Sequence, residues 1–192
     1  NAQREFVYLR RRHALDGDRL QIDISNMIFE TCEAIINQNK AAKDFQNFEF
    51  ELIRFSSISS PFSEDEFNSS SEQELANILY DTVTKHYKEK VEKNALLTYP
   101  VIKNVYENEG DRYERIVVPF SDGIKTLQVV TNLKEAYETK GKSLATDFEK
   151  NITLAIIDEN WKDHLRQMDD LKQSVQNASY EQKDPLLIYK FE

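Results

Sequence analysis

Residues 144–175 read LATDFEKNITLAIIDENWKDHLRQMDDLKQSV, and this stretch decides the fold class. Its apolar side chains recur at steps of three and four, which is the spacing of one face of a helix. They form two tracks, so the apolar face is wide enough to contact more than one neighbour. The tracks are Leu144, Phe148, Ile152 and Ile156, and then Ile157, Trp161, Leu165 and Met168, joined by Leu171 and Val175. We predict a helix over about 132–175, in which Gly141 allows a break.

A polar segment follows this helix at residues 176–183 and contains Tyr180. Asp184 followed by Pro185 is a strong signal for the start of another helix, because Asp caps a helix and Pro fits its first turn. The sequence therefore predicts a helical hairpin over 144–192, with a short tip that carries Tyr180 and a second helix that is cut short. At the tip, Tyr180 either grips a varied partner or folds back onto its own hairpin.

Further helices are predicted upstream from the same periodicity. Their ranges are about 2–39, 44–57, 72–97 and 100–109. Gly17 could bend the first of them, Pro100 should separate the last two, and Gly110 should end the series. Between 56 and 71 the serine-rich composition indicates a linker with Pro61. Capping boxes are predicted where Ser63 precedes Glu66 and where Ser71 precedes Glu74.

Residues 113–131 have a different pattern, with β-branched runs on both sides of Asp122-Gly123. Asp-Gly is a hairpin turn signal, so we predict paired strands at about 113–119 and 125–131. A lone hairpin is marginal in water and should lie against a helix. The predicted fold is therefore mainly α: long scaffold helices, a helical wing, one small β-hairpin at about 113–131 and a truncated helical hairpin.

The composition narrows the possible functions. The 25 basic and 34 acidic residues give a net charge of −9, which disfavours a nucleic-acid binder. Cys32 is the lone cysteine and should be a buried structural thiol, since no internal disulfide can form. The longest apolar run, residues 154–157, is far too short to cross a bilayer, and the first 30 residues lack a signal-peptide pattern.

No enzyme motif is apparent in the sequence. The four glycines are scattered and no phosphate-binding G-x-x-x-x-G-K-[ST] occurs, so we expect no catalysis by this chain alone. The three histidines are far apart and lack partners at metal-ligand spacing, so we expect no metal site. The acidic residues after Trp161 alternate with basic ones at helical spacing and indicate a solvated face.

Arg10, Arg11 and Arg12 form a basic cluster. They bind an external anionic group such as a phosphate or lipid head group, form a plain exposed helix face, or dock against acidic residues of the same chain. Consecutive helical residues point in different directions, which weakens the case for a single patch.

Two C-terminal stretches resemble one family closely. WKDHLRQMDDLK at 161–172 and YEQKDPLLIYK at 180–190 resemble the C-terminal region of SecA, the bacterial preprotein translocase ATPase, and NAQR at 1–4 with Val7, Tyr8 and Arg11 resembles its long scaffold helix. The two ends together cover about 50 residues of the chain. We also expect the chain to be part of a longer protein.

The resemblance implies that three segments of the chain correspond to different parts of the family's structure. Residues 1–40 would be part of the scaffold helix, 41–143 the helical wing region and 144–192 the two-helix finger. Tyr180 would contact the translocating polypeptide. The finger helix and tip would include Trp161, His164, Met168, Asp169, Gln182, Lys183, Asp184 and Pro185.

The resemblance also implies partners and a location. These are the SecYEG channel, an unfolded preprotein and the motor domains of the parent chain, at the cytoplasmic face of the bacterial inner membrane. ATP and magnesium would be used by those motor domains, and this chain would hold no cofactor itself. Where many members have L-R-G before the tip Tyr, this chain has Asn177, Ala178 and Ser179, which leaves the tip conformation open. The alternative is a non-enzymatic helical interaction scaffold unrelated to secretion.

Overall fold

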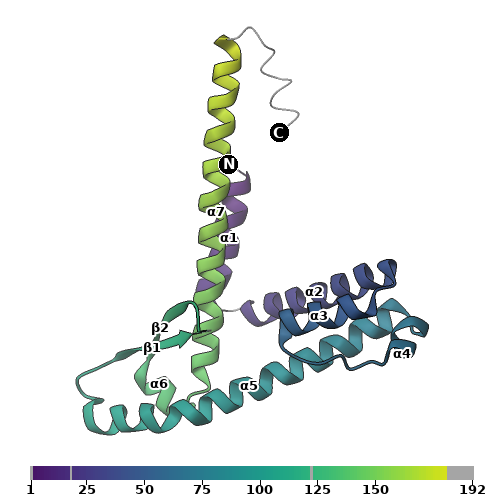
Figure 1. Cartoon of the computed structure of the whole chain (residues 1–192). Coiled ribbons are helices and arrows are strands. Elements are labelled where there is room, and N and C mark those ends of the chain that lie inside the picture. The colour runs from purple at the N-terminus through teal and green to yellow at the C-terminus, as the bar shows by residue number, and fades with distance from the viewer. Residues whose placement is uncertain (1, 18, 122, 181–192) are drawn as a thin grey trace. The chain divides into compact units, whose positions relative to one another are not determined.

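A computed structural model describes residues 2–17, 19–121 and 123–180. The chain divides into two compact units. The larger unit is residues 19–149, and the smaller unit combines 1–18 with the residues from 150 onward. The elements, drawn in Figure 1, are α1 (Ala2–Asp16), α2 (Leu20–Ala42), α3 (Phe45–Ser56), α4 (Glu64–Ser69), α5 (Glu72–Glu109), β1 (Arg115–Ser121), β2 (Thr126–Asn132), α6 (Leu133–Glu138) and α7 (Ser143–Tyr180). The mainly α fold with one small hairpin is confirmed.

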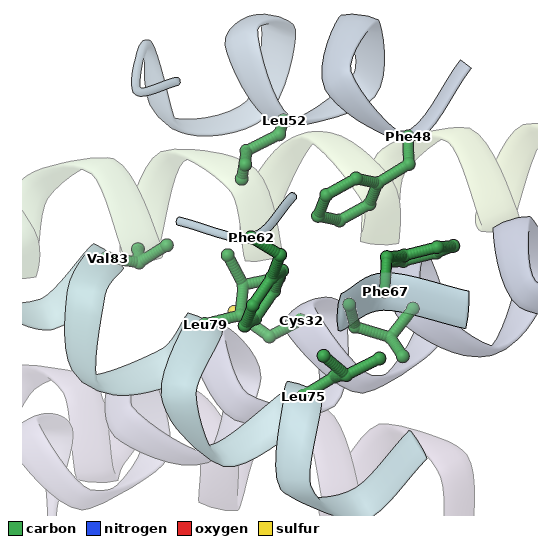
Figure 2. Packing of buried hydrophobic residues seen from close by; sticks show 9 residues of the cluster. Cys32, Phe48, Leu52, Phe62, Phe67, Leu75, Leu79 and Val83 are labelled. Atoms are coloured by element: carbon green, nitrogen blue, oxygen red, sulfur yellow. The ribbon is translucent and has the colours of Figure 1, made fainter. Parts of the chain in front are cut away.

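The larger unit has its main core where α2, α3, α4 and the first half of α5 meet. Phe48 of α3 stacks on Phe67 of α4 with ring centroids 4.7 Å apart, and both side chains are fully buried. Figure 2 shows these rings facing aliphatic side chains from the other helices. The buried members of this phenylalanine core are Cys32, Ile36, Phe48, Leu52, Phe62, Phe67, Leu75, Leu79 and Val83.

A second core joins the C-terminal half of α5 to α6, the start of α7 and the hairpin. Its buried members are Ile102, Leu133, Ala136 and Leu144. Every second residue of β1 faces this core, since Ile116, Val118 and Phe120 pack against it. The antiparallel register runs from Arg115 opposite Asn132 to Ser121 opposite Thr126. The predicted hairpin and its support by a helix are therefore confirmed, with β1 shifted by about two residues and β2 by about one.

Two glycines set breaks in the helical chain. Gly17 has φ +78°, a conformation that residues with a Cβ avoid, and it separates α1 from α2 within the range predicted as one helix. Gly141 has φ +83° between α6 and α7. A Cβ on Gly141 would also lie 3.1 Å from the backbone oxygen of Ala95, so this turn approaches α5 closely.

The predicted interruption at Pro100 is wrong. Helix α5 continues through Pro100 without a break for 38 residues. A proline inside a helix costs about 3 kcal/mol, so tertiary packing on both sides must hold the helix together. Ala95 before the proline and Ile102 after it are both buried, which anchors each half of α5.

The linker predicted at 56–71 holds an additional short helix. Ser63 caps α4 in a complete capping box, with its amide and hydroxyl both donating to Glu66 at 2.8 Å. These bonds, led by the one from the backbone, lower the pKa of the Glu66 carboxyl. Ser71 caps α5 by accepting from the Glu74 amide at 3.3 Å. Phe67 turns α4 into part of the core, which a composition rule for linkers does not detect.

Candidate functional site on helices α1 and α7

The smaller unit consists of α1 and residues 150–180 of α7. Arg11 joins the two helices, because its Nε donates to Oδ1 of Asp158 at 3.0 Å and its Nη2 donates to Oδ2 at 3.4 Å. The hydrogen bond to Asp158, reinforced by the charge of that carboxylate, raises the pKa of the Arg11 guanidinium. A two-point contact of this kind fixes the orientation of both side chains.

An open apolar groove of about 650 Å³ lies between these two helices. Trp161 and His164 of α7 form one part of its wall and stack with ring centroids 5.4 Å apart. His164 Nε2 lies 3.4 Å from the Gln3 side-chain oxygen on α1. Phe6 on the opposite side keeps 58% of its surface exposed. The groove is therefore an apolar surface with one polar contact across it, between His164 and Gln3.

The three consecutive arginines of α1 have different surroundings. Arg11 pairs with Asp158, and the guanidinium of Arg10 lies 5.3 Å from the centre of the Phe6 ring. Arg12 is exposed. The structure thus gives Arg11 the intramolecular docking role, which was one of the three alternatives from the sequence.

The other candidate residues lie farther along α7. Met168 is 39% exposed and Asp169 is exposed. Helix α7 continues to Tyr180, so the tip does not begin at residue 176 as predicted. Residues 176–179 contain neither Gly nor Pro, and nothing in their backbone requirements stops a helix there. The side chain of Tyr180, and the residues Gln182, Lys183, Asp184 and Pro185, lie outside what the structure describes.

The larger unit contains a buried carboxylate that was not predicted from the sequence. Glu149 is 7% exposed and accepts hydrogen bonds from Tyr87 at 2.6 Å and from the side-chain amide of Gln21. Burial, followed by this bond and the charge of Glu149, raises the pKa of the Tyr87 hydroxyl. The three residues connect α2, α5 and α7 inside the larger unit. Tyr87 and Gln21 lie 62 and 128 residues from Glu149 in the sequence, so helical periodicity could not reveal these contacts.

The described residues contain neither a cluster of metal ligands nor a helix that could span a membrane. Among residues 2–17, 19–121 and 123–180, no group of three His, Cys, Asp or Glu side chains could hold a metal ion. Within that same part of the chain, no helix combines the length and the apolar character required to cross a bilayer.

These elements define the chain as a mainly α module of long and short helices with one small antiparallel β-hairpin. The chain belongs to the SecA family, because the SecA Wing and Scaffold domain matches residues 1–192. Relatives named protein translocase subunit SecA align over all 192 residues at 64% identity in Christiangramia forsetii, 59% in Flavobacterium psychrophilum and 50% in Parabacteroides distasonis. The chain spans 17% of the length of each of these relatives. No solved structure matches it.

Proposed function

We propose that this chain passes ATP-driven motion of SecA motor domains to an unfolded preprotein at the SecYEG channel. Family membership supports a role in protein translocation. The motor domains, with their ATP and magnesium, would lie elsewhere in the parent chain. The proposed site of action is the cytoplasmic face of the inner membrane, and a role there as peripheral rather than embedded protein is compatible with the described helices.

The observation that carries this proposal is the length and support of α7. The helix has 38 residues, which at 1.5 Å per residue is a rod of about 57 Å. Arg11 and the wall of the apolar groove hold α1 along it. A rod that is braced along one side and reaches Tyr180 is suited to transmitting displacement to whatever Tyr180 touches.

Tyr180 would supply the contact with substrate. A tyrosine ring packs on side chains of many kinds while its hydroxyl bonds to backbone, so it suits a partner of varied sequence. The resemblance at 180–190 assigns this role to Tyr180, and the described part of α7 extends as far as this residue. The alternative of an adaptor unrelated to secretion has no comparable support, because the whole chain matches SecA.

The test uses the full-length protein with Tyr180→Ala. Loss of aromatic contacts worth about 0.5–1.5 kcal/mol should slow preprotein translocation into membrane vesicles by roughly 2- to 10-fold. Basal ATP hydrolysis should not change, since the motor domains are untouched. Tyr180→Phe, which keeps the ring, should retain most of the rate.

Phe50→Ala is the matched control, because Phe50 is an aromatic residue of the larger unit that is 63% exposed. It should translocate at the rate of the unmodified protein. Normal translocation by the Tyr180→Ala variant would contradict the proposed contact.

A further inference from the structure

A second apolar groove runs along the hairpin in the larger unit. It has a volume of about 620 Å³ and lies between the C-terminal half of α5 and β1. Its lining includes Leu97 and Val101 from α5 and Tyr113, Val117 and Pro119 from the hairpin side. All of its strand residues come from β1, which places the groove at the edge of β1 that faces away from β2.

The hydrogen-bond phase of the hairpin determines which backbone groups reach that edge. The Leu133 amide donates to the Glu114 carbonyl at 3.0 Å, so 114 and 133 are a hydrogen-bonded pair. In an antiparallel ladder such pairs alternate with pairs that turn their amides and carbonyls outward. With the observed register, Arg115, Val117, Pro119 and Ser121 are the outward residues of β1.

Pro119 agrees with this phase, because a proline has no amide and is tolerated where the amide would point away from the partner strand. The edge is therefore interrupted at 119. Between Arg115 and Val117 it offers two amides and two carbonyls at the spacing of a β-strand. The two-stranded sheet has no third strand in the described part of the chain that covers this edge.

The side chains next to this edge are unusually apolar for a surface. Leu97 is 68% exposed, Val101 is 66% exposed and Val117 is 56% exposed. Among the residues that line the groove, Arg115 is the one with a charge. Natural edge strands are commonly protected by charged side chains or by a covering segment, and here Pro119 protects only the distal part.

We propose that the edge of β1 binds an extended apolar peptide with an acidic flank, which pairs with residues 115–117 as a third strand. An extended backbone fits because the open amides and carbonyls follow β spacing, which a helical partner cannot match. Every second side chain of the peptide would lie in the groove against Leu97 and Val101. An acidic residue would lie beside Arg115. The inference does not depend on the role of Tyr180 or on the translocation proposal.

The experiment measures binding of a fluorescein-labelled peptide, Glu-Val-Thr-Val-Thr-Val-amide, to the full-length protein by fluorescence anisotropy. Val117→Pro removes one outward amide and leaves the β1–β2 hydrogen bonds intact, because Val117 is in an outward pair. It should weaken binding by at least about fivefold, since a backbone donor is lost and the edge is shortened.

Val130→Pro is the matched control, because Val130 is the register partner of Val117 and also belongs to an outward pair. It places the same substitution on the opposite edge of the hairpin and should leave binding unchanged. Amide hydrogen exchange provides a second readout that does not depend on variants. The amides of Arg115 and Val117 should exchange more slowly when the peptide is present.

Three results of the peptide experiments would overturn the proposal. These are no binding of the peptide, equal loss of binding in both proline variants, and unchanged exchange at Arg115 and Val117 in the presence of bound peptide. A dimer that Val117→Pro dissociates would also overturn it, because the occupant of the edge would then be a second copy of the chain. Light scattering on the unmodified protein and on both variants distinguishes that case.

Discussion

The two units of the chain bury their apolar side chains to very different extents. The larger unit has a closed core in which Phe48, Phe67 and Leu75 are fully or almost fully buried. In the described part of the smaller unit, Ala14 is the one buried hydrophobic residue. Phe6, Leu9 and many apolar residues of α7 stay half-exposed there.

This difference separates two uses of an amphipathic helix. In the larger unit the apolar faces of the helices are buried in the internal core, and this burial stabilises the unit. In the smaller unit two helices share an ion pair and an open groove, and their apolar faces remain available. Exposed apolar surface of this extent is typical of an interaction surface. We therefore expect substitutions in the larger unit to affect stability, and substitutions in the smaller unit to affect partner binding.

A matched pair of Phe→Ala substitutions tests this contrast and should give the largest effect. Phe67 is fully buried and Phe6 is 58% exposed. Phe67→Ala should lower the free energy of unfolding of the larger unit by about 3–5 kcal/mol, because it removes a core ring and leaves a cavity. Phe6→Ala should cost about 1 kcal/mol or less, mostly through lost contact with Arg10. Urea unfolding monitored by amide hydrogen exchange shows which unit loses stability in each variant. Similar losses of unfolding free energy in the two variants would contradict the expected difference between the units.

The pH dependence of unfolding should reveal the closed core in a second way. Burial raises the pKa of the Cys32 thiol from 9.0 to about 11. The folded state therefore resists ionisation that the unfolded state undergoes, so stability is intact below pH 9 and falls as the pH rises from 9 to 11. The loss at pH 10 should be about 1 kcal/mol.

Urea titrations at pH 8 and pH 10 measure this loss, and Cys32→Ala is the control. The variant is less stable at both values, but its decline between them should be smaller by the contribution of the thiol. An equal decline in both proteins would show that Cys32 ionises as readily in the folded state as in the unfolded one.

The smallest effect is expected at the ion pair of the smaller unit. Arg11 and Asp158 both expose about two-fifths of their side chains, at 42% and 41%. Exposed pairs of this kind contribute little to stability and are screened by salt. Arg11→Gln should shift the urea midpoint only slightly, and 1 M NaCl should abolish the difference. A large shift of the urea midpoint that salt does not abolish would contradict this expectation. It would mean that the ion pair is a main source of stability for the smaller unit.

The sequence predicted what local patterns encode. Gly17 and Gly141 marked real breaks, the Ser63 box formed, and the hairpin around Gly123 was placed correctly. The predictions that failed did so because tertiary packing overrode the local pattern. Pro100 did not interrupt α5 because residues on both sides of it are anchored in cores, and a local rule for proline contains no such information.

The contacts of the candidate site were also only partly predictable from local sequence patterns. Trp161 and His164 were identified by resemblance, and the structure places both in one groove with Gln3 and Phe6. The partner of Arg11 could not be found from the sequence, because Asp158 is 147 residues away among other acidic side chains. Long-range polar contacts of this kind, including those of Glu149, need the fold before they can be assigned.

Photocrosslinking is the sharpest test of whether Tyr180 of α7 contacts the moving polypeptide. Benzoylphenylalanine replaces Tyr180 in one full-length protein and Phe50 in a second, and each is irradiated with a preprotein stalled during ATP-driven translocation. We predict crosslinks to the preprotein from position 180 and none from position 50. Absence of crosslinks at 180, in a protein that still translocates, would contradict the account.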